Sequence, residues 1–364
     1  MRIRALALSI CTASLLVSVG TADAAPADTV RAGLDELIRS GAVGALATLT
    51  ADGATTLTTA GLADAASGTP IPADRPVHVR VGSITKTFTA AVVLQLVAEH
   101  RVELDAPVDT YLPGLLTGDG IDGRVITVRQ ILGHRSGLPE PVLPGMDEHQ
   151  AAVRGRTFTP AQAVALALRN PARFTPGTRF EYANINYHVA GMLIEAVTGH
   201  RYGDELRDRI LTPLDLSHTY LPGTGETDLR TPHPTGYTTV DGIVTDETRM
   251  EPSVPWAAGA LVSTGADLNR FYTALLAGRV IPRAQLRDML DGVDMGNGDG
   301  MSYGLGVGYT QLPCGARYIG HLGDVRGFAA IAGATPNGRA VTISYTGTPT
   351  AVNLGGLLTG ALCP

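Results

Sequence analysis

Ser83 and Lys86 stand three residues apart, and together they could carry out acyl transfer. Lys86 is the only lysine in the chain; every other member of the 28 basic residues is an arginine. Arginine keeps its charge, whereas burial can make a lysine amine neutral and able to accept a proton. Residues i and i+3 share one face of a helix. A serine beside such an amine can lose its proton and attack a carbonyl carbon.

The segment after Ser83 is the most apolar helix that the sequence predicts. From Ile84 to about His100, apolar residues recur at helical spacing and leave almost no polar face. A helix of this kind is buried, so Lys86 is expected in the core. Ser83 then stands at the helix N-terminus, where the dipole favours an anion and disfavours an ammonium. The alternative is a capping serine followed by a solvated lysine.

Two later motifs could complete such a site. Tyr182 and Asn184 form Y-x-N, in which the phenol could shuttle a proton and the amide could reach either the lysine or a substrate. His321 and Gly323 form H-x-G at the end of a predicted strand, followed by Asp324. A glycine there allows close backbone approach, and free N–H groups can bind an oxyanion. Each motif alone more often marks a capped loop or a histidine beside a turn.

Taken together, the three motifs resemble those of the serine β-lactamase and DD-peptidase superfamily. Y-x-N resembles the class C β-lactamases, and H-x-G resembles the soluble actinomycete D-alanyl-D-alanine carboxypeptidases. Three further segments resemble family segments, and the likeness covers essentially the whole mature chain. They are 130–138 (QILGHRSGL), 174–177 (FTPG) and 258–264 (AGALVST).

This resemblance implies an acyl-enzyme on Ser83, with Lys86 and Tyr182 handling protons. It also implies an oxyanion hole made by the backbone N–H groups of Ser83 and Asp324. It requires no metal and no cofactor. The residues implied in substrate binding are Asn184, Trp256, His321, Gly323 and Asp324.

The third motif departs from the carboxypeptidase pattern. Those enzymes carry hydroxyl residues where this chain has Leu322 and Asp324, and an ionised aspartate repels a terminal carboxylate. Arg326 could compensate, or Asp324 could point away. We expect a D-alanyl-D-alanine carboxypeptidase on peptidoglycan-type stem peptides, with β-lactams as inhibitors. The alternatives are an esterase or D-amino-acid amidase on a small ester or amide, a β-lactamase, and a penicillin-binding sensor without turnover.

The predicted elements place the motifs in one α/β (α+β) fold. Helices at 26–40 and about 352–362 flank an antiparallel sheet built from strands at 42–50, 55–62, 303–311, 316–321, 327–333 and 339–345. Residues 103–251 read as an inserted helical lobe, with 161–168 and 187–197 as its clearest helices. The sheet lobe then comprises 26–102 and 252–364, and the two lobes form a single β-lactamase-type catalytic domain over 26–364.

The N-terminal residues, the cysteines and the net charge indicate in which cellular compartment the protein acts and which partners it lacks. Residues 1–25 have two early arginines, a short apolar run and small residues, which predicts a cleaved signal peptide and secretion without a stable membrane anchor. Cys314 and Cys363 then remain, either as a disulfide or as two buried thiols. A net charge of -6 without a basic patch argues against nucleic acid. We expect a monomer.

Overall fold

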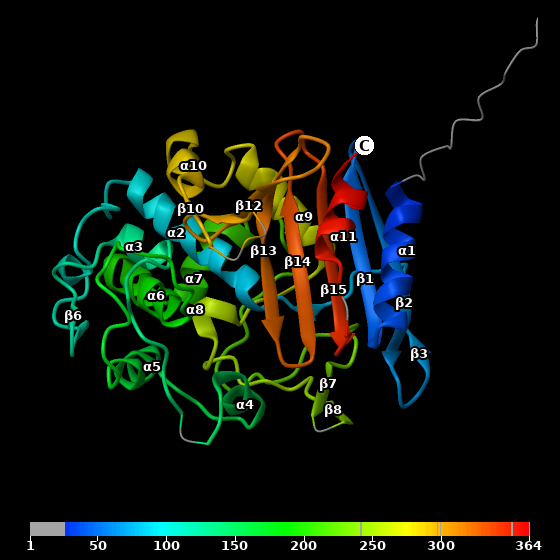
Figure 1. Cartoon of the computed structure of the whole chain (residues 1–364), viewed down its shortest axis with the longest axis horizontal. Helices are drawn as coiled ribbons and strands as arrows, with labels where there is room; N and C mark the ends of the chain where they lie inside the picture. Colours follow the sequence, from blue (N-terminus) through cyan, green and yellow to red (C-terminus); the bar gives the residue numbers. More distant parts are fainter. Residues whose placement is uncertain are drawn as a thin grey trace, which may run out of the picture.

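The computed structural model describes residues 26–364 except positions 144, 241, 297, 299, 351 and 364. The signal peptide predicted over residues 1–25 lies outside the described residues. Figure 1 shows the described chain as one sheet with helices on both faces and a group of helices beside it.

The sheet joins strands from the two ends of the chain, as the sequence predicted (Figure 1). β1 (Ala42–Ala51) pairs antiparallel with β2 (Ala54–Asp64) on one side and with β15 (Ala340–Gly347) on the other. In the described residues the sheet has nine strands, in the spatial order β10 (Val293–Asp294), β11 (Ser302–Tyr303), β12 (Gly308–Gln311), β13 (Arg317–Val325), β14 (Phe328–Ala334), β15 (Ala340–Gly347), β1 (Ala42–Ala51), β2 (Ala54–Asp64) and β3 (Thr69–Pro70). Three short pairs lie apart from it: β4 (Val79–Arg80) with β9 (Val262–Ser263), β5 (Thr117–Gly118) with β6 (Ile121–Asp122), and β7 (Tyr237–Val240) with β8 (Ile243–Asp246).

Two apolar cores lie on the two faces of the sheet. On the outer face, α1 (Pro26–Arg39) and α11 (Leu354–Leu362) pack together, and Leu34, Ile343 and Leu358 belong to the core beneath them. On the inner face, α9 (Gly265–Leu276) covers β1, β14 and β15. The remaining helices are α2 (Thr85–Ala98), α3 (Val128–Leu132), α4 (Glu148–Val153), α5 (Pro160–Ala167), α6 (Ile185–Thr198), α7 (Tyr202–Leu206), α8 (Trp256–Gly259) and α10 (Arg283–Leu290), with short turns η1 (Gly82–Ile84), η2 (Val108–Thr110) and η3 (Arg207–Leu211).

Helix α2 runs through the larger core, as its all-apolar pattern predicted. Its three buried threonines are each satisfied by a hydrogen bond to another segment or to the turn before the helix. Thr85 Oγ1 donates to Gly82 O at 2.7 Å, and Thr87 Oγ1 donates to Gly306 O at 2.7 Å. Thr89 Oγ1 donates to a carbonyl of α8 at 2.8 Å. Because buried polar groups need partners, these bonds fix the rotation of α2 and the direction of every side chain on it.

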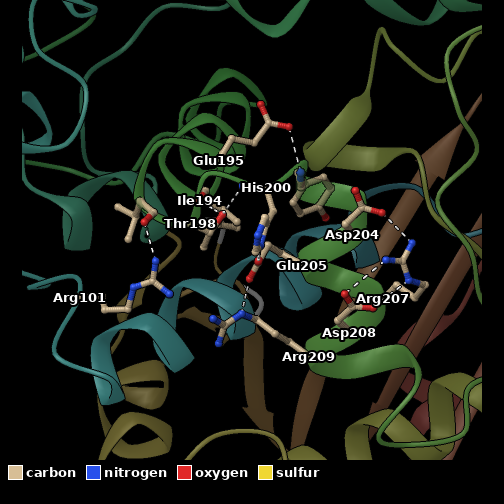
Figure 2. Close-up of polar contacts among 12 residues, drawn as sticks. Arg101, Ile194, Glu195, Thr198, His200, Asp204, Glu205, Arg207, Asp208 and Arg209 are labelled. Carbon is tan, nitrogen blue, oxygen red and sulfur yellow. Dashed lines mark hydrogen bonds and ion pairs between the residues drawn. The ribbon is translucent and has the colours of Figure 1, made fainter.

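A polar cluster holds the far ends of the helices that carry the site (Figure 2). Glu205 of α7 is 7% exposed, and its carboxylate contacts His200 at 2.6 Å as well as Arg209. Arg209 also reaches Glu99, at the end of α2, at 3.2 Å. Exposed ion pairs contribute little to stability. Apolar packing therefore contributes most to the position of α2, and this cluster links the end of α2 to α7 and η3.

Two boundaries differ from the prediction in ways that affect the site. α2 begins at Thr85 rather than at Ile84, and Ser83 lies in the preceding 3-10 turn η1. β13 does not end at His321, as predicted, but continues through the H-x-G motif to Val325, because pairing with β14 extends from Ile319 to Val325. The structure also joins Cys314, in the turn between β12 and β13, to Cys363 after α11 in a disulfide.

Candidate active site

Ser83 and Lys86 are in contact at the centre of the molecule. Ser83 is half-buried in η1, and Lys86 Nζ lies 2.9 Å from Ser83 Oγ. Lys86 itself is fully buried, with 0% of its surface exposed. The turn from η1 into α2 thus places a serine at the surface of the cleft and its amine directly below.

The other two partners of Lys86 are both carbonyl oxygens. Nζ donates to Asn184 Oδ1 at 2.8 Å and to Ala258 O at 2.8 Å. Burial lowers the pKa of Lys86 to about 7, although the Glu148 and Glu140 carboxylates act in the opposite direction. A neutral amine has two hydrogens and one lone pair. Because carbonyls can only accept, they take the two hydrogens, and the lone pair is left to face the Ser83 hydroxyl.

Tyr182 closes the site from the loop before α6. Its phenol hydrogen-bonds to the Ser83 side chain, and its ring centroid lies 4.9 Å from Lys86 Nζ. Burial raises the pKa of Tyr182, so the phenol keeps its proton at neutral pH. His134 stacks on the Tyr182 ring with centroids 4.1 Å apart. The His134 Nδ1 accepts a hydrogen bond from the Ala183 N–H at 3.1 Å, which fixes the backbone beside Tyr182.

Two glutamates that sequence reasoning missed surround Asn184. Glu148 of α4 accepts from Asn184 Nδ2 at 3.1 Å, which orients the amide so that its oxygen faces Lys86. Glu140 accepts from the backbone N–H groups of Asn184 and Ile185, at the start of α6. Burial raises the pKa of both carboxyl groups. No periodic pattern marks these glutamates in the sequence; only acidic residues in a Pro-rich loop could have suggested a helix N-terminal contact.

The third motif lies on a free edge of β13. β12 pairs with β13 only as far as Gly320, so beyond this residue β13 has no strand partner on that side among the described residues. A Cβ on Gly323 would lie 1.8 Å from Val81 O, and a Cβ on Gly82 would lie 2.6 Å from the Asp324 nitrogen. Both glycines are therefore required for η1 and β13 to touch. This contact brings the amides of Ser83 and Asp324 to the same place.

Side chains alternate along β13, so Leu322 and Asp324 lie on the opposite face from His321, although both still line the cavity at Ser83. His321, Gly323 and Val325 are buried on the inner face, whereas Leu322 and Asp324 are exposed on the opposite face. His321 Nε2 lies 2.9 Å from the Tyr303 hydroxyl. Burial, with a smaller contribution from Lys86, lowers the pKa of His321 to about 3, so this imidazole is neutral.

Trp256 and Arg326 also lie in positions that differ from the predicted ones. Trp256, expected to line the cleft, starts α8 and folds back against Gly191 and Tyr202, and it is not among the described residues that line the cavity. Arg326, which could have compensated Asp324, bonds instead to Glu247 at 3.1 Å. Sequence proximity to a motif does not fix the direction of a side chain.

The cleft around Ser83 has a volume of about 1260 Å³. Among the described residues that line it, Glu148 and Asp324 contribute carboxylates, His149 and His321 contribute imidazoles, and no arginine or lysine is present. The cleft is therefore acidic above the buried amine of Lys86. Within the part of the chain that the structure describes, no group of three or more His, Cys, Asp or Glu side chains is placed to hold a metal ion. The described helices include none with the length and hydropathy needed to span a bilayer.

The fold and the contacts of Ser83 define the class of protein. The protein has an antiparallel sheet, a serine at the edge of the sheet and a buried lysine beneath that serine. This combination is characteristic of the serine hydrolases of the β-lactamase and penicillin-binding-protein superfamily. The chain belongs to the Beta-lactamase family, with residues 27–354 matching.

Two solved structures are similar over nearly the whole chain. A D-stereospecific amidohydrolase from Streptomyces sp. is 36% identical with a TM-score of 0.83, over 92% of this chain and 98% of that chain. D-amino acid amidase from Ochrobactrum anthropi SV3, in complex with L-phenylalanine amide, is 29% identical with a TM-score of 0.80, over the same shares. Among curated relatives, Unguisins hydrolase ungD from Aspergillus violaceofuscus is 33% identical over 229 residues, which are 59% of this chain but only 39% of that protein.

Proposed function

We propose that this protein is a D-stereospecific amidohydrolase that cleaves amides of D-amino acids carrying a free α-ammonium group. The observation that carries the proposal is the charge of the cleft, whose described lining supplies Glu148 and Asp324 but no guanidinium or further ammonium. Acidic groups attract an ammonium and repel a carboxylate. The likeness to the Streptomyces amidohydrolase and the Ochrobactrum amidase supports the same substrate class.

Glu148 is the group we assign to the substrate ammonium. It lines the cleft and is held by Asn184, whose oxygen contacts Lys86. A substrate carbonyl at Ser83 would thus have its α-carbon near Asn184 and its ammonium toward Glu148. A carboxylate at this end of the substrate would meet a like charge.

Acylation follows from the contacts of Ser83. The neutral Lys86 amine takes the Ser83 proton, and Oγ forms a bond to the amide carbon. The amide N–H groups of Ser83 and Asp324 bind the oxyanion. The C–N bond then breaks, and the leaving nitrogen takes a proton from the Tyr182 phenol, which recovers one from Lys86. Deacylation repeats these steps with water as the nucleophile, releasing the D-amino acid and restoring Ser83.

A carboxypeptidase on D-Ala-D-Ala peptides is the second candidate, favoured by the resemblance of the motif at His321 and Gly323 to that of the actinomycete carboxypeptidases. Its substrate ends in a carboxylate, which needs hydroxyl or cationic partners. Leu322 offers neither, and Arg326 is committed to Glu247. The amidase proposal therefore has the stronger physical support.

A substrate panel tests the proposal. We expect purified protein to hydrolyse D-phenylalaninamide with a kcat/KM at least ~100-fold above that of L-phenylalaninamide. N-acetyl-D-phenylalaninamide, which lacks the ammonium, should lose about 100-fold because Glu148 is left without its partner. Ser83→Ala and Lys86→Arg should be inactive, the latter because arginine cannot accept a proton.

Liquid chromatography of the released amino acid is the measurement. Release of D-alanine from an N-acylated D-Ala-D-Ala peptide, with no turnover of D-phenylalaninamide, would replace the amidase with the carboxypeptidase. Full activity in the Ser83→Ala variant would refute both the amidase and the carboxypeptidase function.

A further inference from the structure

The cavity at Ser83 continues across β13 onto the outer face of the sheet. The same cavity that contains Ser83 and Tyr182 is also lined by Leu354 and Leu358 of α11. Figure 1 shows α11 alongside β15, while β13 and β14 present this face without a helix across it. Leu322 is 46% exposed and stands where the cavity passes over β13.

The outer part of the cavity has Asp324 as its one ionisable carboxylate among the described residues, and Leu322, Ile331, Leu354 and Leu358 line it together with the uncharged polar side chains of Thr310, Gln311 and Asn353. Leu322 pairs with Ile331 across β13 and β14, so their side chains lie next to each other on the outer face. We call the part of the cavity lined by Leu322, Ile331, Leu354 and Leu358 the outer groove; Leu322 and Leu354 are its accessible side chains, since Ile331 and Leu358 are 3% and 5% exposed. The carboxylates and imidazoles that line the cavity come from α4 and β13; β12, β14 and α11 contribute none among the described residues.

The size of the cavity exceeds the needs of a single amino-acid amide. Small-molecule pockets usually measure about 300–1,000 Å³, and this cavity measures about 1260 Å³. If the proposed function holds, the D-amino-acyl half of the substrate lies between Ser83 and Glu148. The remaining space, which ends at α11, then belongs to the group that leaves with the nitrogen.

We propose that the outer groove binds apolar side chains of a peptide leaving group. This inference rests on the proposed function and narrows its substrates to peptides that begin with a D-residue and continue with apolar residues. Hydrolysis breaks the first peptide bond: the D-residue is transferred to Ser83, and the shortened peptide leaves with a proton on its new amine. Continuity of the groove with the cleft identifies its occupant as part of the substrate.

Matched substrates separate the groove from the catalytic site. D-alanyl-L-leucyl-L-leucinamide and D-alanylglycylglycinamide have the same length and the same scissile bond type, but only the first carries apolar side chains. We expect its kcat/KM to be at least about tenfold higher, because burying a leucine side chain is worth about one factor of ten or more.

Leu354→Glu should reduce this leucine-to-glycine ratio about tenfold, since it puts a charge into the groove. Leu354 begins α11 and is half-buried, and a carboxylate in the first turn of a helix is favourable, so the fold should tolerate the change. The matched control is Ile243→Glu, at an exposed position of β8 outside the cavity lining, which should leave the ratio as in the wild type.

Equal rates on the two peptides, or a ratio unaffected by Leu354→Glu, would overturn the proposal while the amidase function stands. Failure to cleave any D-alanyl substrate would instead overturn the proposed function. The groove is then tested by calorimetry with Ser83→Ala: we expect binding of L-leucyl-L-leucinamide but not of glycylglycinamide. Equal binding of the two, or binding of neither, would refute it.

Discussion

At the scale of the residue, Lys86 is defined by what surrounds it. Two carbonyl oxygens take its hydrogens at 2.8 Å each, and Ser83 Oγ lies at 2.9 Å. Burial is the main cause of its lowered pKa. An ammonium here lacks solvent and has no carboxylate in direct hydrogen-bond contact among the described residues. The same environment that makes the amine a base should therefore make its protonation destabilise the fold.

The stability of the protein should depend on this one amine. The pKa of Lys86 is about 7 in the folded chain, and a lysine in an unfolded chain has a pKa of about 10.4. Between these pH values the unfolded chain binds more protons, so the free energy of unfolding rises with pH. Relative to that of Lys86→Met, the free energy of unfolding of the wild type should increase by about 3 kcal/mol between about pH 6.5 and pH 9.5. Urea unfolding at both pH values measures this.

Ser83→Ala is the control for this measurement, because it keeps the amine and should follow the wild-type pH dependence. The comparison is clean because no other lysine titrates in this range. If the free energies of unfolding of wild type and Lys86→Met changed with pH by the same amount, the lowered pKa of Lys86 would be refuted.

At the scale of the element, the contact between η1 and β13 builds the oxyanion site. Gly82 has a φ of +50°, which favours glycine, and faces the Asp324 amide nitrogen. Gly323 meets Val81 from the other side. The close approach of the Ser83 and Asp324 amides therefore depends on the absence of side chains at Gly82 and Gly323.

Gly82→Ala should therefore lower kcat/KM by at least about 100-fold, the usual cost of losing one oxyanion donor. Gly53→Ala is the matched control: its φ is +79°, but its Cβ would meet nothing within 4 Å. Both variants should lose about 1 kcal/mol of stability from backbone strain, and Gly82→Ala should lose more because its Cβ would lie 2.6 Å from the Asp324 nitrogen. Only Gly82→Ala should lose activity, measured on D-phenylalaninamide alongside thermal unfolding. Equal activity in the two variants would contradict the role of this contact.

Contacts between residues close together in the sequence were predicted better than contacts between residues far apart in it. Ser83 and Lys86 are adjacent because helical spacing makes them so, and the buried pattern of α2 was legible in its apolar residues. Asn184 and His321 were linked to them only through family resemblance. Glu148 was missed because a loop and a short helix bring it to Asn184, and Trp256 was misplaced because backbone direction at α8 decides its orientation.

At the scale of the whole molecule, the two chain ends meet in one sheet, and a covalent link fastens the second of them. β1 and β15 are neighbours, so the fold is complete only when both ends have been joined. Cys314 and Cys363 tie the turn after β12 to the end of α11. The wall of the outer groove is therefore attached to the sheet by the disulfide as well as by its apolar face.

Removing the disulfide should destabilise the protein by about 4 kcal/mol, from the chain-entropy model for its loop with a sequence separation of 49 residues. The double variant Cys314→Ser, Cys363→Ser should show this loss in denaturant unfolding. Wild type measured in a reductant should match the variant. A difference under about 1 kcal/mol would mean that α11 is held by its apolar contacts alone.

The solitary lysine has a practical consequence for biochemical work on this protein. Reagents that join or label amines act on lysine side chains and on the chain's α-amino group, and the single side-chain amine is fully buried. Amine-directed cross-linkers would therefore have the α-amino group as their one accessible amine, and an assembly would be linked only where two such groups lie within reach of each other. Oligomeric state should be measured by sedimentation or light scattering, and surface attachment is better directed to carboxylates.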